Sequence, residues 1–289
     1  MARARDIGRR MKSVTSTRKI TRTMEMVATS KLRRAQARVH EARPFAEKVA
    51  SVVENLVTPE IAELEPILRQ PERIRRAAVV LVTSNRGLCG AFNVNLIRKA
   101  RELLAYLEES DVVTDFHVVG KKGIAYFRFR GVEMASARTD ISDAPTADQA
   151  RGLITPLAER FVDADLDAIY IVHADYQSVL SSPPIARKLL PVHVPDEGPK
   201  RGAAYYILDP SAREILAKIL PLYLTNVTYR ALVENAAAEQ GARRTAMKAA
   251  TDNADEFLTT LRRQFNRARQ AEITQQIAEI IGGAEALSS

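Results

Sequence analysis

The chain has 289 residues, 46% of them apolar, and a single cysteine, so it can bury a substantial core but cannot form a disulfide within itself. Its 43 Lys and Arg residues exceed its 35 Asp and Glu residues by eight, and no apolar run approaches the ~20 residues of a membrane-spanning helix. These properties exclude a disulfide scaffold and a dithiol switch within the chain, and they predict a soluble protein of a reducing compartment.

The positive charge is concentrated at the N-terminal end. Residues 1–45 carry 13 basic and 3 acidic residues, whereas residues 230–289 carry 8 of each. A concentrated basic segment indicates an anionic partner: nucleic acid, a membrane or an acidic protein surface. An Arg-rich, acid-poor start is also typical of organelle transit peptides, but helical spacing begins by Ile7 and favours a mature protein of bacterial or similar origin.

Residues 3–57 are predicted to form one long helix, interrupted only by Gly8 and Pro44. Its expected length is roughly 80 Å, far above that of an ordinary globular helix, with a bend expected at Pro44. Apolar residues at steps of three and four give this helix one apolar face: Ile7, Met11, Val14, Ile20, Met24, Val27, Ala35, Val39, Val49, Val53 and Leu56.

The middle of the chain alternates between strand and helix patterns. Residues 77–84, 114–120 and 167–176 are short apolar runs typical of buried strands, and residues 93–110 and 146–165 have helical spacing. This alternation predicts a small α/β domain with a mainly parallel sheet. Prolines then mark a loop-rich exit, at Pro183, Pro184, Pro191, Pro195 and Pro199.

Residues 222–281 are predicted to form a second long helix, so that roughly 90 Å of helix is expected at this end. Asp209-Pro210 supplies an N-cap signal for the preceding helical stretch, and Gly282-Gly283 supplies a stop. The alanine-rich stretch at residues 230–255 suggests close helix approach and a slim rod. Apolar or small residues again step by three and four, at Val233, Ala237, Met247, Ala250, Ala254, Leu258, Leu261, Phe265, Ala268, Ile273, Ile277 and Ile280.

Two long helices with single apolar faces must bury those faces, and the simplest solution is to pair with each other. The predicted fold is therefore a small Rossmann-like α/β domain with a mainly parallel sheet, inserted between N- and C-terminal helices that form a long antiparallel coiled coil. The predicted segments are 1–58, 59–208 and 209–289.

The loop Ser84–Asn93 is the strongest candidate for chemistry, because Gly87 and Gly90 lie between a strand and a helix and would let backbone amides hold a phosphate. The favoured alternative is structural, a tight strand-to-helix connection in which glycine supplies the turn geometry. A Walker loop, however, ends in Gly-Lys-Ser/Thr, and this loop does not. Cys89 lies before a helix, a position that lowers a thiol pKa, but no Cys–His spacing supports a nucleophile. We expect no catalytic residue, cofactor or metal site in this chain.

Other titratable residues fit structural roles. His117 and His173 lie inside apolar strands, where packed histidines are commoner than catalytic bases. Asp163, Asp165 and Asp167 alternate at a predicted helix exit, and we expect them to form a solvated cap and not a cation loop.

The basic N-terminal helix leaves three interpretations open. It matches a helix that follows a phosphate backbone, a helix that docks on acidic protein loops, or a solvated face. Met24, Met26 and Val27 within the basic stretch favour protein contact. A basic coiled-coil nucleic-acid-binding protein stays open as the alternative function, and a nucleotide-hydrolysing enzyme has the least support.

Four separated stretches resemble the gamma subunits of F-type ATP synthases, in the same order and over nearly the whole chain. They are Arg18–Lys31 (RKITRTMEMVATSK), Arg86–Gly90 (RGLCG), Met247–Ala254 (MKAATDNA) and Asn266–Gln275 (NRARQAEITQ). The chain departs from the family pattern at Asn85 and Gln276, where Asp and Glu are usual, and each exchange removes a charge.

The resemblance implies a non-catalytic rotor subunit of the central stalk. In that family the coiled coil stands inside a ring of alternating alpha and beta subunits, and the α/β domain sits on the epsilon subunit and the membrane ring of c subunits. Rotation would couple proton or sodium flow to ATP synthesis or hydrolysis, with no nucleic-acid partner. The implied location is peripheral, on the cytoplasmic face of a bacterial inner membrane.

The resemblance also implies where partners bind. Arg22 and Lys31 would meet acidic loops of beta subunits, and Arg269, Gln270 and Thr274 would form a polar grip on one of them. Ile273, Ile277 and Ile280 would turn in an apolar sleeve. The residues expected at partner interfaces are Ile20, Arg22, Met24, Val27, Lys31, Arg86, Cys89, Arg269, Gln270, Thr274, Ile277 and Ile280.

Overall fold

The computed structural model describes residues 2–56, 65–192 and 212–288. The chain divides into two compact units. The smaller unit contains residues 1–28 and 244–289, and the larger unit contains residues 29–243. Parts of both long terminal helices therefore belong to the same compact unit as the sheet.

Both long terminal helices are confirmed. Helix α1 is Ala2–Leu56, with Pro44 inside it, and helix α6 is Ala212–Ser288. The predicted stop at Gly282-Gly283 is wrong, because α6 continues through both glycines. Each helical glycine costs only about 1 kcal/mol relative to alanine, and the good helix formers that follow compensate. The predicted cap at Asp209-Pro210 lies outside the described residues.

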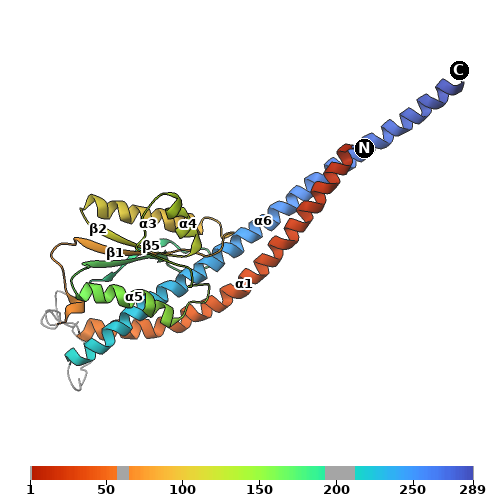
Figure 1. Ribbon diagram of the computed structural model, residues 1–289. Coiled ribbons are helices and arrows are strands. Elements are labelled where there is room, and N and C mark those ends of the chain that lie inside the picture. Colours follow the sequence, from red (N-terminus) through yellow and green to blue (C-terminus); the bar gives the residue numbers. More distant parts are fainter. Residues whose placement is uncertain (1, 57–64, 193–211, 289) are drawn as a thin grey trace. The chain divides into compact units, whose positions relative to one another are not determined.

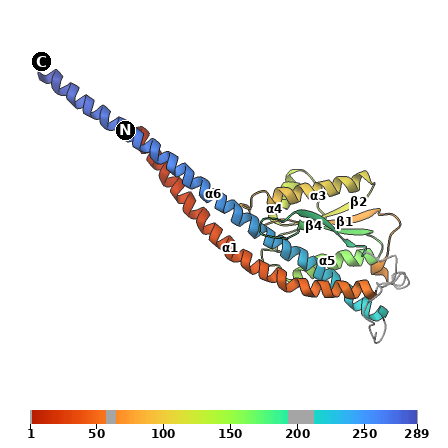
Figure 2. The same ribbon diagram turned by 180° about the vertical axis from the view of Figure 1, so that it is seen from behind.

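In the smaller unit α1 and α6 run antiparallel and in contact. Three contacts fix their register: Gly8 lies against Phe265, Arg18 pairs with Asp255, and Thr21 bonds to Thr251. The residue numbers of each pair add up to 272 or 273, so α6 residues beyond about 271 have no partner on α1. Figures 1 and 2 show α6 continuing past the first residue of α1.

The face that α1 buries is not the predicted one throughout. Ile20 is 60% exposed and Val27 is 51% exposed, whereas Thr21 and Ala28 are buried. The predicted α6 face is confirmed as far as Leu261, because Met247, Ala254, Leu258 and Leu261 are buried, whereas Ile273, Ile277 and Ile280 are exposed. Small residues on α1 let the helix axes approach closely, so the larger apolar side chains point outward.

The buried hydroxyls of Thr21 and Thr251 are 2.8 Å apart, and each also lies within hydrogen-bonding distance of a carbonyl of its own helix. Because each hydroxyl has one proton, one hydroxyl donates to the other, and the second donates to its carbonyl. We expect Thr21→Val to destabilise the helix pair by about 0.5–1.5 kcal/mol, the net worth of one hydrogen bond. The double variant with Thr251→Val should cost less than the sum of the single variants, because it leaves no unpaired buried hydroxyl. Thermal unfolding of the four chains measures this coupling, and strictly additive changes would contradict it.

In the larger unit five strands form one sheet in the order β3-β2-β1-β4-β5. Strands β1 (Arg76–Val82), β2 (Val113–Val119), β3 (Ser136–Arg138) and β4 (Ala168–Ala174) run parallel. Strand β5 (Pro184–Leu190) pairs antiparallel with β4. The predicted mainly parallel sheet is confirmed, and its order is that of a Rossmann fold with a reversed last strand.

Helices cover both faces of the sheet (Figure 1). Helices α3 (Phe92–Glu109) and α4 (Lys121–Phe129) pack on one face through residues such as Leu96 and Phe127. Helix α5 (Ala147–Val162) packs on the other through Leu153 and Phe161, next to Leu232 of α6. A capping box at Thr146 and Gln149 starts α5. A short 3-10 helix, η1 (Pro66–Leu68), contributes Leu68 to a third cluster with α1 and α6.

Two expectations for this unit are wrong. The proline-rich exit contains strand β5 where a loop was predicted, because Pro184 is its first residue and β5 is an edge strand, where proline is tolerated. The alanine-rich stretch Ala231–Gln240 of α6 is buried in the larger unit. Its small residues bring the helix close to the sheet and to α1, so they do not form a free slim rod.

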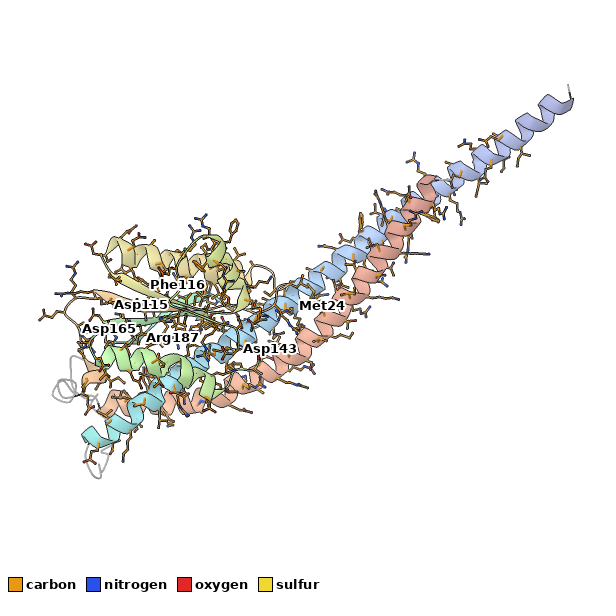
Figure 3. All side chains as sticks on the ribbon, in the orientation of Figure 1. Met24, Asp115, Phe116, Asp143, Asp165 and Arg187 are labelled. Atoms are coloured by element: carbon orange, nitrogen blue, oxygen red, sulfur yellow. The ribbon has the colours of Figure 1, made fainter. Side chains whose placement is uncertain are left out.

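Ion pairs join the amino-terminal ends of the parallel strands. Arg76 pairs with Asp115 at 3.1 Å and with Asp165 at 3.0 Å, and Arg160 pairs with the same two aspartates. Asp167 accepts hydrogen bonds from the backbone amides of residues 75 and 76. Figure 3 labels Asp115 and Asp165 at this end of the sheet. The predicted solvated cap is therefore wrong for Asp165, which joins Arg76 of β1 to Arg160 of α5, and for Asp167, which binds the start of β1 and Arg69.

Candidate functional site

The predicted interface residues fall into three groups. One group lies on α1 opposite the α6 residues near 250, and a second lies on α6 beyond residue 268, more than 20 Å further along the helix at 1.5 Å per residue. Both belong to the smaller unit, whereas Lys31, Arg86 and Cys89 belong to the larger unit. The α1 and α6 groups are therefore two separate surfaces of the smaller unit, and the third group is described within the larger unit.

The α1 group combines an apolar and a basic surface. Ile20, Arg22 and Val27 are exposed, and Met24 is half-buried; Figure 3 labels Met24 on α1. Large exposed apolar side chains beside a cation fit a protein surface better than a purely solvated helix face.

The α6 group begins opposite the first residues of α1, at Arg269 and Gln270, and continues beyond them, where the helix has no partner on α1. Arg269, Gln270 and Thr274 are exposed, as are Ile277 and Ile280, and Ile280 is 71% exposed. Polar residues thus precede an apolar end on a single unpaired helix. Such an end can contact a surrounding surface through many sides at once.

The loop after β1, residues 84–91, has a fixed conformation. Leu88 and Gly90 have φ angles of 62° and 56°, and the Ser84 hydroxyl donates to the carbonyl of Arg86 over 2.6 Å. The Asn93 side chain accepts from the Ser84 amide at 3.0 Å. The loop is therefore built to hold its peptide groups in defined directions.

The carbonyls of this loop face a cation. The Arg243 guanidinium of α6 donates to the carbonyls of Arg86 and Gly87 at 3.3–3.4 Å and pairs with Glu239 at 2.6 Å. A phosphate-binding loop presents N–H groups to its ligand, whereas this loop presents acceptors to an arginine. The geometry favours the structural interpretation of Gly87 and Gly90.

Cys89 is an internal residue of the same loop, with 2% of its surface exposed. Burial raises the pKa of its thiol despite the nearby Arg243, so the expectation of a thiol pKa lowered by the helix is wrong. The side chain of Cys89 is buried within the chain, and the place of Cys89 at a partner interface stays a prediction.

Helix α6 fills the crevice in which Rossmann folds bind ligands. The strand order reverses between β1 and β4, and ligands of such folds bind at the carboxyl ends of the strands at this switch point. Here Asn235 accepts from the amide of Ala174 at the end of β4 (3.0 Å). Arg243 donates to the carbonyls of the loop after β1. The position of a nucleotide is thus taken by the chain's own helix.

Two further absences hold for the described residues. No group of three His, Cys, Asp or Glu side chains there is placed to hold a metal ion. None of the described helices is both long and apolar enough to cross a membrane.

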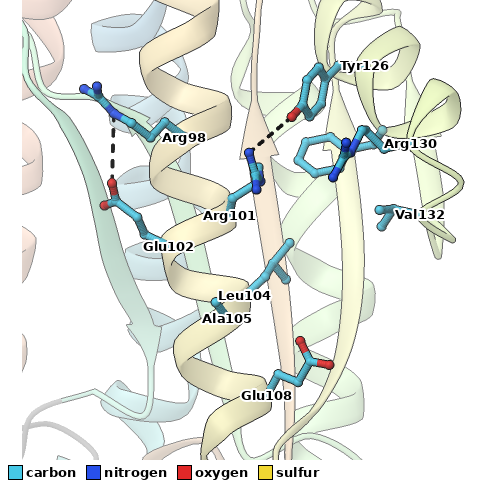
Figure 4. A pocket seen from close by; sticks show the side chains of 10 residues that line it. Arg98, Arg101, Glu102, Leu104, Ala105, Glu108, Tyr126, Arg130 and Val132 are labelled. Carbon is cyan, nitrogen blue, oxygen red and sulfur yellow. Dashed lines mark hydrogen bonds and ion pairs between the residues drawn. The ribbon is translucent and has the colours of Figure 1, made fainter.

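An open depression of about 520 Å³ lies between α3 and α4 (Figure 4). Arg98 lies 4.0 Å from Glu102, and Arg101 donates to the Tyr126 hydroxyl over 3.5 Å. With Arg130 and Glu108 also in its lining, the depression has nearly balanced charge. It is a polar surface feature and contains none of the predicted interface residues.

His173 on β4 is fully buried, and burial, with Arg187 nearby, lowers its pKa from 6.5 to about 4. Between these values the unfolded chain binds a proton that the folded chain does not, so the free energy of unfolding falls as pH falls from about 6.5 to 4. The expected loss approaches about 3 kcal/mol. Denaturant unfolding from pH 7 to 4 measures it.

The control for this pH dependence is His173→Met, which puts an apolar side chain of similar size, without a titratable group, at the same position. Burial raises the pKa of Glu239, which acts in the opposite direction, so the difference in slope between the two chains is the relevant quantity. The free energy of unfolding should fall less steeply with falling pH in His173→Met than in the parent chain. Identical slopes would mean that His173 does not cause the loss.

Sequence reasoning missed Glu239, Arg243 and Asp143, and it noted Asn85 only as a departure from a family pattern. A signal was present for the first two, because they are charged residues four apart inside an alanine-rich apolar helix. Nothing in the local sequence of Asp143 indicates its partner, Lys31, since the two are 112 residues apart.

Comparison with known proteins gives consistent similarities. A family model described as ATP synthase matches residues 3–287. The chain is 51% identical to an ATP synthase gamma chain of Gemmatimonas aurantiaca over 288 residues, covering 99% of each. It is 39% identical to that of Leptospira biflexa over the full length of both. In fold it is similar to a chain of the Euglena gracilis mitochondrial ATP synthase, with a TM-score of 0.67 at 19% identity, covering 98% of this chain and 94% of that one.

Proposed function

This chain belongs to the ATP synthase gamma-chain family, and from that premise we propose that it is the rotating shaft of the complex. In this proposal it transmits torque between a membrane ring of c subunits and a catalytic hexamer of alpha and beta subunits. Ion flow through the ring thereby drives ATP synthesis, and ATP hydrolysis drives ion flow in reverse. A chain of this family is a non-catalytic component of the enzyme.

The observation that carries the proposal is the antiparallel helix pair of the smaller unit. Its register is fixed by Thr21–Thr251 and Arg18–Asp255, and its seam is made of small and apolar residues. Two helices joined along their length resist bending and twisting better than one. The surface of the pair is also asymmetric, so it biases three chemically identical catalytic sites differently as it turns.

We assign the exposed α1 group to contact with the hexamer. Ile20 and Val27 supply apolar area, and Arg22 supplies charge for acidic loops of the beta subunits. Lys31 already pairs with Asp143 at 2.6 Å within the chain, so its ammonium has less capacity for a partner. Removing the charge of Arg22 should therefore weaken contact with the beta subunits, and with it the coupling of ATP hydrolysis to rotation. Removing the charge of Lys31 should have less effect on that contact.

We assign Arg269, Gln270 and Thr274 to a polar grip on one beta subunit, and Ile277 and Ile280 to an apolar bearing. Apolar contact has no preferred direction, so it lets the end turn with little resistance. The sheet unit then contacts the epsilon subunit and the c-ring. No nucleic-acid partner is part of the proposal, and the location is peripheral, on the cytoplasmic face of a bacterial inner membrane.

Reconstitution of the complex with and without this chain tests the proposal. With the chain, ATP hydrolysis should pump ions into vesicles; without it, any hydrolysis should pump none. A chain lacking residues 280–289 should still assemble and pump but give a less stable complex, because only the end of the bearing is lost. Pumping by a complex without the chain would overturn the proposed function.

A further inference from the structure

Both long helices are tied to loops at the carboxyl edge of the sheet, close to the boundary of the larger unit at residues 29 and 243. Arg243 ties α6 to the loop after β1, and Lys31 ties α1 to the loop before α5. We call the set Lys31, Asn85, Asp143, Glu239 and Arg243 the collar. All five belong to the larger unit.

The α6 tie is buried and has several bonds. The Arg243 side chain is 9% exposed and makes three hydrogen bonds to the carbonyls of Arg86 and Gly87, besides its 2.6 Å pair with Glu239. Only a guanidinium has enough fixed donors to serve a carboxylate and two carbonyls together. The loop cannot follow another path without leaving buried polar groups unpaired.

The α1 tie reaches the same loop through Asn85. Lys31 pairs with Asp143 at 2.6 Å. The Asn85 amide donates to the carbonyls of Thr139 and Ile141 at 3.1 and 2.9 Å, and its oxygen accepts from the amide of Lys121. That backbone donor fixes which end of the amide is oxygen. Both helices are thus bonded to one connected set of loops.

These ties carry charge. Two other directional contacts between the helices and the sheet are neutral: Asn235 accepts from the Ala174 amide, and Gln36 donates to the Tyr176 hydroxyl. Over residues 231–238 most of the other α6 contacts are apolar, from Ala231, Leu232, Val233, Ala237 and Ala238. Small apolar contacts are non-directional and oppose rotation of a helix about its axis only weakly. Charged hydrogen bonds at the end of long side chains are directional and act about 5 Å from the axis, so they resist such rotation.

We propose that the collar is a torsional lock, which fixes both helices to the sheet domain so that torque passes between them without slip. The proposal rests on the proposed function as a rotor. Arg243 and Asp143 are positioning residues in this role. Asn85 joins the two ties, and its amide donors explain why this chain has Asn at that position, since a carboxylate would face two carbonyl oxygens.

Arg243→Lys in the whole reconstituted complex tests the α6 tie. Lysine keeps the charge, and with it any electrostatic contact to partner subunits, but it has no fork to hold both carbonyls. Exchange of the backbone amides of Ser84 and Lys122, which depend on the loop, should be about tenfold faster. With an ion gradient already imposed, the variant complex should pump fewer ions per ATP than the unmodified complex. Without a gradient, the two complexes should pump equally.

The matched control is Arg244→Lys, the same change at the adjacent position, which should alter neither measurement. Asp143→Asn tests the α1 tie without touching a predicted interface residue, and Asp111→Asn, at an exposed site, is its control. Asp143→Asn should show the same loss under load in a milder form. If the Arg243→Lys complex fails to assemble, Asp143→Asn still tests the proposal.

Two results would overturn the lock. One is unchanged loop exchange in Arg243→Lys, which would mean that Arg243 does not hold the loop. The other is faster exchange with full pumping against the gradient in both collar variants, which would mean that the collar bears no torque. Either result leaves the rotor function intact, because the unmodified complex still pumps. Failure of the unmodified complex to pump would instead count against the proposed function.

Discussion

Ala254→Pro should abolish ATP-driven ion pumping in the reconstituted complex. Ala254 is buried in the helix pair, between the contacts at Thr251 and Asp255. Proline there removes a helix hydrogen bond and collides with the preceding turn, which costs about 3 kcal/mol or more and kinks the helix. A kinked α6 cannot keep its register with α1, so twist is lost at that point.

The control for this helix break is Ala254→Ser, which keeps the backbone N–H and whose hydroxyl bonds to the carbonyl four residues earlier, so it costs far less than proline and bends the helix only slightly. Circular dichroism of both chains and pumping by both complexes are the measurements. Full pumping by Ala254→Pro would show that torque does not require an unbroken α6.

Phe161→Ala should destabilise the larger unit by about 3–5 kcal/mol, the usual cost of emptying a core phenylalanine site. Phe161 is 0% exposed at the end of α5, and the guanidinium of Arg69 lies 4.9 Å from its ring centre. Arg69 also donates to the carbonyl of Leu166 and pairs with Asp167. The substitution therefore leaves a cavity and loosens an arginine that ties η1 to the sheet.

Val162→Ala is the control for this cavity, because Val162 is the next residue and 40% exposed. It should change the free energy of unfolding by less than about 0.5 kcal/mol. Denaturant unfolding compares the two. A loss at Phe161 no greater than that at Val162 would mean that the packing of α5 on the sheet is not as described.

The long helices and the parallel strands were predictable because their patterns are strong and local. Residues 77–84, 114–120 and 167–176 are apolar runs that became β1, β2 and β4. The elements that were missed are short or have conflicting signals. Helix α4 has nine residues, β3 has three, and β5 begins and ends beside prolines.

The buried face of α1 was harder to predict because the face was identified from large apolar residues at three- and four-residue steps. The helix pair instead buries Thr21 and Ala28, which are small, and exposes Ile20 and Val27. Helix spacing alone cannot separate a face that packs within the chain from one that meets a partner. The predicted interface role of Ile20 and Val27 remains a prediction, and their exposure is compatible with it.

The collar was not predictable, because its bonds join residues far apart in the sequence. Lys31 and Asp143 are 112 residues apart, and Arg243 meets Gly87 across 156 residues. The glycines of the loop after β1 suggested that its amides would donate to a phosphate. In the structure its carbonyls accept hydrogen bonds from Arg243. Which peptide group a loop presents depends on backbone angles such as those of Leu88 and Gly90, and composition does not specify them.

Direct observation of rotation tests the central claim. A probe attached through Glu109→Cys, at the exposed end of α3, would report on the sheet unit, while the buried Cys89 would take up little label. With the alpha and beta hexamer fixed to a surface and ATP supplied, we predict continuous turning of the probe in one direction. A probe that stays still while the same complexes hydrolyse ATP would contradict the account.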